Sequence, residues 1–315
     1  MVRAMRAPDA LSAGSLRKAN GSELTARTWP KAPPENYRPS TLRLLTGLAT
    51  SYKGDRRMGV AAGADGRLQG FVLSRSRATG IIWDVEHLVA AEADPAFELL
   101  AWACDCALVA GGRRVFLETP AEGLGATVAR RAGFERYSDG TTYRLDSGFP
   151  PGDNEAMPAR PRLSSDEQGL FQLYNAAVPA PVRAAEAMTY EEWRALYRGR
   201  KAWAPSVLGS QDDFVWELGA RIIGWMRLIY GARSQFLELL VHPLYESYAD
   251  KMLQSALSQT SSKVPVLVDV REYHAGARAA LERAGFRAGD AYTIWVRQLA
   301  TRIPEPAGAV AQVPA

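Results

Sequence analysis

The sequence has few of the residues that build disulfide frameworks or metal centres. Among its 315 residues are two cysteines and three histidines. Cys104 and Cys106 lie two residues apart in a segment that we predict to be helical, where a bridge between them is geometrically implausible. His87, His242 and His274 have no metal-ligand spacing. The sequence therefore excludes a disulfide framework, and it predicts free thiols in a reducing cytoplasm and no metal site.

Long hydrophobic runs are absent as well. No window approaches the ~18 uncharged apolar residues of a membrane-spanning helix, and the first residues lack the apolar region of a secretory signal. We therefore expect a cytoplasmic protein without a membrane partner. Apolar residues make up 47% and charged residues 23% of the chain, which is ordinary for a globular protein and excludes general disorder.

Charge of one sign does not gather in any part of the chain. The net charge is 38 − 34 = +4, and the basic residues are spread along the sequence between acidic ones. Nucleic-acid-binding proteins usually cluster their basic residues, so we expect no nucleic-acid partner, while a weak preference for anionic partners stays open. Nucleophile-elbow and Walker motifs are absent, and the turn at 123–128 has Val128 where a dinucleotide-binding turn has its third glycine.

What the sequence does contain is an internal repeat. A strand-like run at 115–119 precedes a helix-like run that ends in Arg131-Ala132-Gly133-Phe134, and a run at 266–270 precedes one that ends in Arg283-Ala284-Gly285-Phe286. The offsets between matching positions are 266 − 115 = 151 and 285 − 133 = 152. Two further pairs of segments have offsets of 152 and 154: 85–89 with 237–241, and 70–73 with 224–227. Four segments at nearly one offset predict two copies of one domain.

The repeat divides the chain into two domains joined by a linker. We predict an N-terminal domain over 1–149, whose start is poorly patterned, and a C-terminal domain over 162–300. Residues 150–161 are rich in proline, glycine and polar residues without periodicity, which is typical of a linker. Residues 301–315 contain three prolines and no period, which predicts a disordered tail.

The order of elements within each copy predicts an α/β fold. In the second copy, capping-box patterns at 164–167 and 189–192 open two helices, and three strand-like runs follow, the last at 235–241. A helix, a strand, a helix and a last strand complete the copy. In the first copy, Asp94 is predicted to cap the helix that follows it. This order predicts two tandem domains, each a twisted mixed β-sheet flanked by helices.

The order of elements resembles the GNAT acetyltransferase superfamily. The resemblance rests on Val241-His242-Pro243-Leu244-Tyr245, which is similar to the end of that family's fourth strand and the turn after it, and on the Arg-Ala-Gly-Phe run of each copy. It covers roughly residues 58–146 and 162–298 and implies a tandem GNAT protein. It further implies an N-acyltransferase with acetyl-coenzyme A as donor and a small-molecule or peptide amine as acceptor.

The motifs that would bind the coenzyme are degenerate in both copies. The family places an Arg or Gln followed by spaced glycines at this turn, where backbone N–H groups hold the pyrophosphate. The matching positions of the second copy hold Glu246, Ala249 and Lys251, and the first copy has Asp94-Pro95 in this region. A carboxylate in place of a cation or an amide repels the phosphates, so these departures disfavour acetyl-coenzyme A binding.

Candidate catalytic residues are few. The positions that match the family's proton-donating tyrosine hold Ala129 and Leu281, which cannot donate a proton. Glu86 and Glu238 lie at matched positions on the proposed fourth strands, where a carboxylate can accept the proton of an attacking amine. The alternative for each is a glutamate that pairs with an arginine. By the resemblance, the coenzyme would be contacted by the end of the second copy's fourth strand and the helix after it: Leu240, Val241, Tyr248, Ala249 and Lys251.

Two functions therefore stay open at the level of the sequence. One is an acyl-coenzyme A-dependent N-acyltransferase, by resemblance. The other is a catalytically degenerate pair of domains that binds a small molecule or a peptide, or serves as a scaffold. The sequence does not indicate an oligomeric state.

Overall fold

The computed structural model describes residues 1–19, 24–27, 41–50, 54–77, 80–149, 156–186, 189–198, 211–231 and 233–299. The predicted tail and residues 150–155 of the predicted linker lie outside these ranges. The N-terminal half contains β1 (Val2–Ala4), α1 (Ala7–Ala19), β2 (Leu24–Arg27), α2 (Thr41–Thr50), β3 (Arg56–Ala62), β4 (Leu68–Ser76), β5 (Ile82–Ala90), α3 (Ala93–Val109), β6 (Arg114–Pro120), α4 (Leu124–Arg131) and β7 (Glu135–Leu145). The C-terminal half contains β8 (Arg160–Pro161), the 3-10 helix η3 (Ser164–Asp166), α5 (Glu167–Ala177), α6 (Ala180–Glu186), α7 (Tyr190–Arg198), β9 (Gln211–Leu218), β10 (Arg221–Tyr230), β11 (Gln235–Val241), the 3-10 helix η4 (Pro243–Tyr248), α8 (Ala249–Ser258), β12 (Val266–Arg271), α9 (Ala275–Arg283) and β13 (Arg287–Gln298).

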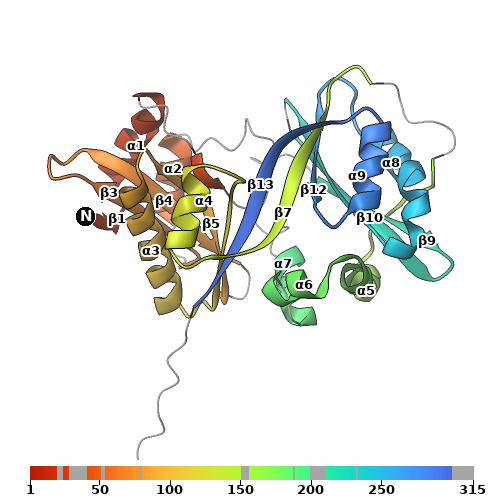
Figure 1. Cartoon of the computed structure of the whole chain (residues 1–315), viewed down its shortest axis with the longest axis horizontal. Helices are drawn as coiled ribbons and strands as arrows, with labels where there is room; N and C mark the ends of the chain where they lie inside the picture. Colours follow the sequence, from red (N-terminus) through yellow and green to blue (C-terminus); the bar gives the residue numbers. More distant parts are fainter. Residues whose placement is uncertain are drawn as a thin grey trace, which may run out of the picture.

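The described strands form one 13-stranded sheet that runs through both halves (Figure 1). Its order is β1-β3-β4-β5-β6-β13-β7-β12-β11-β10-β9-β8, and β2 pairs with β5. Counted inward from either edge, the two halves have the same order, because β1, β3, β4, β5 and β6 match β8, β9, β10, β11 and β12. The prediction of a repeated α/β fold with twisted, mixed sheets flanked by helices is confirmed.

The last strands of the two copies are exchanged at the centre of the sheet. β7 comes from the N-terminal half but pairs with β12, and β13 comes from the C-terminal half but pairs with β6. Trp295 of β13 is buried in the N-terminal core, where its indole N–H donates to the Thr119 hydroxyl over 2.9 Å. Tyr143 and Leu145 of β7 are buried in the C-terminal core. The predicted boundaries 1–149 and 162–300 divide the sequence into its two copies. They do not divide the structure into two separate sheets, because β7 and β13 each pair with a strand of the other half.

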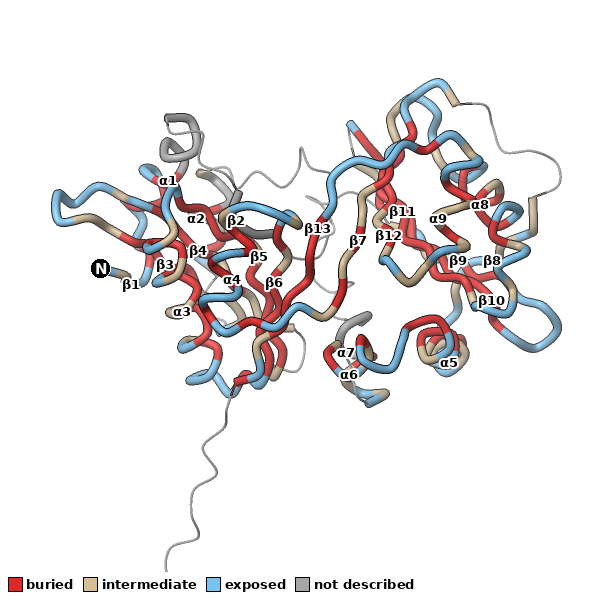
Figure 2. Tube along the Cα trace, in the orientation of Figure 1, coloured by how far each residue is buried: buried red, intermediate tan, exposed pale blue. Residues whose placement is uncertain are grey.

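Helices cover both faces of this sheet. α3 and α4 pack on the N-terminal strands around Leu99 and Leu117, and α8 and α9 pack on the C-terminal strands around Met252 and Leu237 (Figure 2). On the opposite face, α1 and α2 cover β3 and β4, while α5 and α6 lie over the central strands against buried residues of β5, β6, β10, β11 and β13. The central strands are therefore covered by α5 and α6 on the face opposite to α3 and α8.

The helix starts show which local predictions hold. The capping box at 189–192 forms, since the Glu192 N–H donates to the Thr189 hydroxyl over 3.1 Å and the Thr189 N–H donates to the Glu192 carboxylate over 3.2 Å. Asp94 is not a cap: α3 begins at Ala93 with Glu92 at the N-cap, and Asp94 forms an exposed ion pair with Arg131 instead. Both cysteines are free thiols, as predicted.

Candidate functional site

The parallel strands of each half separate soon after they pair. β11 pairs with β12 only over Gln235–Leu237, and β5 pairs with β6 only over Ile82–Asp84. Beyond these residues the sheet opens in both halves. Glu238 and Asp269 stand at the opening of the C-terminal half, one residue past the last pair on each strand.

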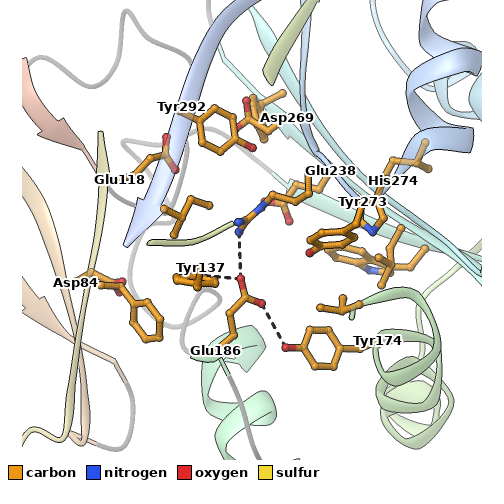
Figure 3. A pocket seen from close by; sticks show the side chains of 18 of the residues that line it. Asp84, Glu118, Tyr137, Tyr174, Glu186, Glu238, Asp269, Tyr273, His274 and Tyr292 are labelled. Carbon is orange, nitrogen blue, oxygen red and sulfur yellow. Dashed lines mark hydrogen bonds and ion pairs between the residues drawn. The ribbon is translucent and has the colours of Figure 1, made fainter. Parts of the chain in front are cut away.

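A cavity of about 160 Å³ adjoins this opening and is built by both halves of the chain (Figure 3). The exchanged strands β7 and β13 cross it, and α5 and α6 close it on the helical side. Its charged side chains come from five elements and the residue after β4: Arg77, Asp84, Glu118, Glu186, Glu238, Asp269 and Arg271. Much of the remaining lining is aromatic, including a tyrosine from each exchanged strand, Tyr137 and Tyr292.

Glu186 of α6 joins three of the surrounding elements. Its carboxylate accepts hydrogen bonds from the Tyr137 hydroxyl over 3.2 Å, the Tyr174 hydroxyl over 3.3 Å and the Arg271 guanidinium over 3.2 Å (Figure 3). Burial opposes the charge of Arg271, but the Glu186 carboxylate and the surrounding tyrosines together outweigh it and raise the pKa of Arg271 well above its ordinary value. Burial, followed by the same carboxylate, raises the pKa of Tyr137. Arg271 therefore stays charged and Tyr137 stays a neutral phenol at physiological pH.

Glu238 faces the cavity because the alternation of β11 is unbroken. Leu237 and Leu239 pack in the core beneath α8, so Glu238, the residue between them, turns to the opposite face. The Glu238 carboxylate lies 3.9 Å from the Arg227 guanidinium of β10. Arg227 is 1% exposed and also donates two hydrogen bonds, of 2.6 and 3.1 Å, to Asp213 of β9. The Glu238 carboxylate thus lies between the Arg227 guanidinium and the cavity.

Glu86, the matching residue of the first copy, does not line the cavity. Its carboxylate lies 3.8 Å from the Arg75 guanidinium, so the arginine pair is repeated at an offset of 227 − 75 = 152. The β4–β5 register shifts between Leu73 and Ser74, which marks a bulge that contains Glu86, whereas β10 and β11 pair without a shift. Burial raises the pKa of Glu86, partly offset by the arginines Arg56 and Arg75.

The residues expected to contact a coenzyme do not gather at one surface. Leu240 lines the cavity, while Val241 and Ala249 are buried in the core beneath α8. Tyr248 is half-buried at the end of η4, and Lys251 is exposed on the first turn of α8. The five residues therefore divide between the cavity, the core and the outer surface, and their role stays a prediction.

The turn after β11 places a carboxylate at a helix N-terminus. A methyl group added to Gly276, the second residue of α9, would lie 2.6 Å from the Glu246 carboxyl carbon. Glu246 therefore covers the start of α9, where the partial positive charge of the helix favours an anion. The carboxylate that the sequence places at the phosphate-binding turn lies beside this helix end.

In the N-terminal half, a strand of the chain itself enters the opening between β5 and β6. β2 pairs antiparallel with β5 from Leu24–Val89 to Arg27–His87, beyond the point where β5 leaves β6. The backbone edge that the separation exposes on β5 is thus occupied by β2. The opening beside the cavity in the C-terminal half is the better candidate for a ligand.

Several cavity residues were not predicted from the sequence. Glu118 and Asp269 occupy matched positions of the repeat, at 269 − 118 = 151, and that signal was available. Glu186, Tyr137 and Tyr292 come from segments with no matching motif, and only the exchange of strands brings them together. Among the described residues no group of three or more His, Cys, Asp and Glu side chains is arranged to hold a metal ion. The described helices also include none that is long and apolar enough to cross a membrane.

Comparison with known proteins places this architecture. No family model matches the sequence, and no curated protein matches it significantly. The structure is similar to a GCN5-related N-acetyltransferase from Sphaerobacter thermophilus, with a TM-score of 0.59 and 16% identity over 95% of each chain. It is also similar to a tandem GNAT protein from the clavulanic acid biosynthesis pathway, with a TM-score of 0.54 and 16% identity over 95% of this chain and 98% of that one. The chain has a tandem GNAT fold.

A third similar structure extends this likeness. It is a putative acetyltransferase from Pyrococcus horikoshii, with a TM-score of 0.53 and 10% identity over 95% of this chain and 89% of that chain. At these identities the likeness concerns the tandem GNAT fold alone. The chemistry of the site has to be argued from the residues of this chain.

Proposed function

We propose that this protein is an acyl-coenzyme A-dependent N-acyltransferase whose C-terminal half carries out the reaction. The observation that supports this most is the position of Glu238, which faces a cavity at the point where β11 and β12 separate. In the described part of the chain, no strand pairs with the β12-facing edge of 238–241. An extended, amide-bearing coenzyme chain fits such an edge, because it offers backbone donors and acceptors.

Glu238 acts as the general base in this proposal. Bound acyl-coenzyme A supplies an activated thioester carbonyl, which the acceptor amine attacks from the cavity. Glu238 accepts the proton that the nitrogen loses, the C–N bond forms and the C–S bond breaks. Glu238 releases this proton to solvent, and the departing thiolate takes up one proton from solvent, so the proton count is balanced and the base is restored. Arg227 positions the Glu238 carboxylate from behind and is itself held by Asp213.

The substitution Glu238→Gln tests this function. It retains the shape of the side chain but removes the base, so we expect coenzyme-thiol release with an amine acceptor to fall by about 10²–10⁴-fold. Glu86→Gln is the matched control, because Glu86 also faces an arginine but lies outside the cavity. Full activity in Glu238→Gln contradicts the proposal, and loss of activity in Glu86→Gln alone would move the reaction to the N-terminal half.

A binding module without acyl transfer is the second candidate. It is favoured by the Glu246 carboxylate at the start of α9 and by β2 in the N-terminal opening. Calorimetric titration with acetyl-coenzyme A separates the two candidates. Heat of binding with a dissociation constant below about 1 mM supports the enzyme, and its absence, together with amine binding, supports the module.

A further inference from the structure

The lining of the central cavity has more negative than positive charge. Five carboxylates and two guanidiniums face it, which gives 2 − 5 = −3 when all are ionised. Both arginines already serve neighbouring acids: Arg77 forms two 2.6 Å hydrogen bonds with Asp84, and Arg271 pairs with Glu186. A ligand that enters this space therefore meets an excess of carboxylate.

Two of the carboxylates flank Tyr292, Glu118 from the neighbouring strand on one side and Asp269 from the second strand on the other side. On β6, Glu118 pairs with Ile294, two residues along β13 from Tyr292. On the other side, Tyr292 pairs with Gly140 of β7, and Asp269 of β12 pairs with Thr142, two residues farther along β7. Tyr292 thus lies diagonally between Glu118 and Asp269, in agreement with Figure 3. The exchange of β7 and β13 is what places these matched acids around one ring.

The aromatic lining suits a cation as well. Tyrosine and tryptophan rings attract ammonium groups through their faces, and the cavity is lined by Tyr137, Tyr174, Trp225, Tyr273 and Tyr292. Burial, followed by the Asp269 carboxylate, raises the pKa of Tyr292 well above its ordinary value. The ring is therefore a neutral phenol that adds no charge of its own.

His274 supplies an independent sign of a ligand. Its Nε2 atom is fully buried and has no hydrogen-bond partner among the described residues. Burial and then the Arg271 charge lower the pKa of His274 to about 4, so the imidazole is neutral at physiological pH. A hydrogen bond between the ring and the Ala177 backbone opposes this lowering. A neutral imidazole has one nitrogen that donates and one that accepts, so the buried Nε2 in the cavity wall can bind a polar group of a ligand.

We propose that the cavity binds a small primary amine with a second positive charge, of the diamine class. One ammonium group lies over Tyr292 between Glu118 and Asp269, and the other amino group points to Glu238. The assignment of that second group as the acylated one rests on the proposed function. The cavity volume of about 160 Å³ suits a short, unbranched chain.

The experiment is calorimetric titration of the full chain without any coenzyme. The probes are 1,4-diaminobutane, 1-aminobutane and 4-aminobutanoate, which share one amino end and have a cationic, an apolar and an anionic group at the other end. We expect the diamine to bind at least about tenfold more tightly than the monoamine, because one charge-assisted contact is lost in the monoamine, and the carboxylate analogue to bind most weakly. Equal affinity for all three probes, or preference for 4-aminobutanoate, overturns the proposal.

Variants of Glu118 and Asp269 test where the second ammonium group of the diamine binds. Glu118→Gln and Asp269→Asn should each weaken diamine binding by about tenfold and leave 1-aminobutane binding nearly unchanged. Glu122→Gln is the matched control, since Glu122 is an exposed acid four residues from Glu118 and outside the cavity. Thermal melting of each variant checks that it is folded. If one of the two variants is unfolded, the other one tests the proposal. Equal weakening by the control overturns the proposal.

The proposed function can fail separately. Diamine binding without thiol release in the presence of acetyl-coenzyme A supports the cavity assignment and contradicts the acyltransferase. Thiol release with neutral or anionic amines, with no binding of 1,4-diaminobutane, supports the acyltransferase and overturns the cavity assignment.

Discussion

Single residues differ in their surroundings between the two copies. Glu86 and Glu238 occupy matched positions, and both face an arginine, as the alternative to a catalytic role anticipated. The bulge in β5 adds one residue to the first copy, so Val85 and Leu88 both pack beneath α3 although they are three residues apart. No sequence pattern distinguishes a bulged strand from a regular one here. The sequence could therefore predict the pair of glutamates but not which of them faces a cavity.

Glu246 should weaken coenzyme binding. Its carboxylate covers the start of α9, and repulsion between like charges near 4 Å is ~1 kcal/mol in a water-like medium. We expect Glu246→Gln to bind acetyl-coenzyme A about fivefold more tightly in a calorimetric titration. Glu98→Gln, on the exposed surface of α3, controls for the change in net charge. Weaker binding by Glu246→Gln would show that this carboxylate supports the donor site.

Gly140 makes room for the ring of Tyr292. A Cβ atom at this position would lie 2.3 Å from the Tyr292 hydroxyl oxygen. Gly140→Ala must therefore displace the ring, and we expect it to lower the free energy of unfolding by about 1–3 kcal/mol in urea titrations and to weaken diamine binding. Gly47→Ala, in the middle of α2, is the control: its Cβ atom would lie 3.3 Å from the sulfur of the flexible Met58 side chain, so we expect a smaller loss of stability than in Gly140→Ala. If both variants unfold like the unmodified protein, the contact has no energetic weight.

At the scale of elements, the copies share a way of fixing the first helix to an edge strand. The Arg3 guanidinium of β1 forms 2.6 and 2.8 Å hydrogen bonds with Asp9, and Arg160 of β8 forms 2.7 and 2.8 Å bonds with Asp166. Both pairs have the offset 160 − 3 = 166 − 9 = 157. This repeat was not predicted, because residues 1–60 are poorly patterned and strands of two or three residues leave little periodicity.

Asp166 should make stability depend on pH. Its hydrogen bonds with Arg160 lower the pKa of the folded-state carboxyl, although burial opposes this. As pH falls below about 4, the unfolded chain takes up the proton first, so the stabilisation is complete above that pH and is lost as pH falls through the folded-state pKa. Asp166→Asn should lose about 2 kcal/mol at neutral pH and show a flatter profile in urea titrations between about pH 6 and 3. Asp105→Asn, on the exposed face of α3, should leave the profile as it is.

The sequence predicts elements better than it predicts their neighbours. The strand expected at 235–241 is β11 with the same ends, since an apolar run of this length between turn residues is typical of a buried strand. The runs at 135–145 and 287–298 are strands too, but period-2 alternation indicates only that each is covered on its faces. Which strand lies beside them depends on tertiary packing, so the hydrophobic pattern could not predict the exchange of β7 and β13.

At the scale of the whole molecule, the two halves should not be separable by cutting the linker. β7 completes the C-terminal core and β13 completes the N-terminal core. After protease cleavage within 150–155, we expect the two fragments to elute together in size-exclusion chromatography and to separate only in denaturant. Residues 1–149 expressed alone should lack a cooperative melting transition, because the edge of β6 and the Trp295 site remain open. Fragments that elute separately after cleavage, each with its own transition, would contradict the exchange.

The exchanged strands also set the order of events during synthesis. The N-terminal half leaves the ribosome before the strand that closes its sheet has been translated, and its own last strand has no partner in β12 yet. Until Trp295 emerges, the edge of β6 offers unpaired backbone groups, which is the state in which chains pair with the wrong neighbour. The two copies therefore depend on each other. A truncation or a recombination event that removes one copy also removes the closing strand of the other.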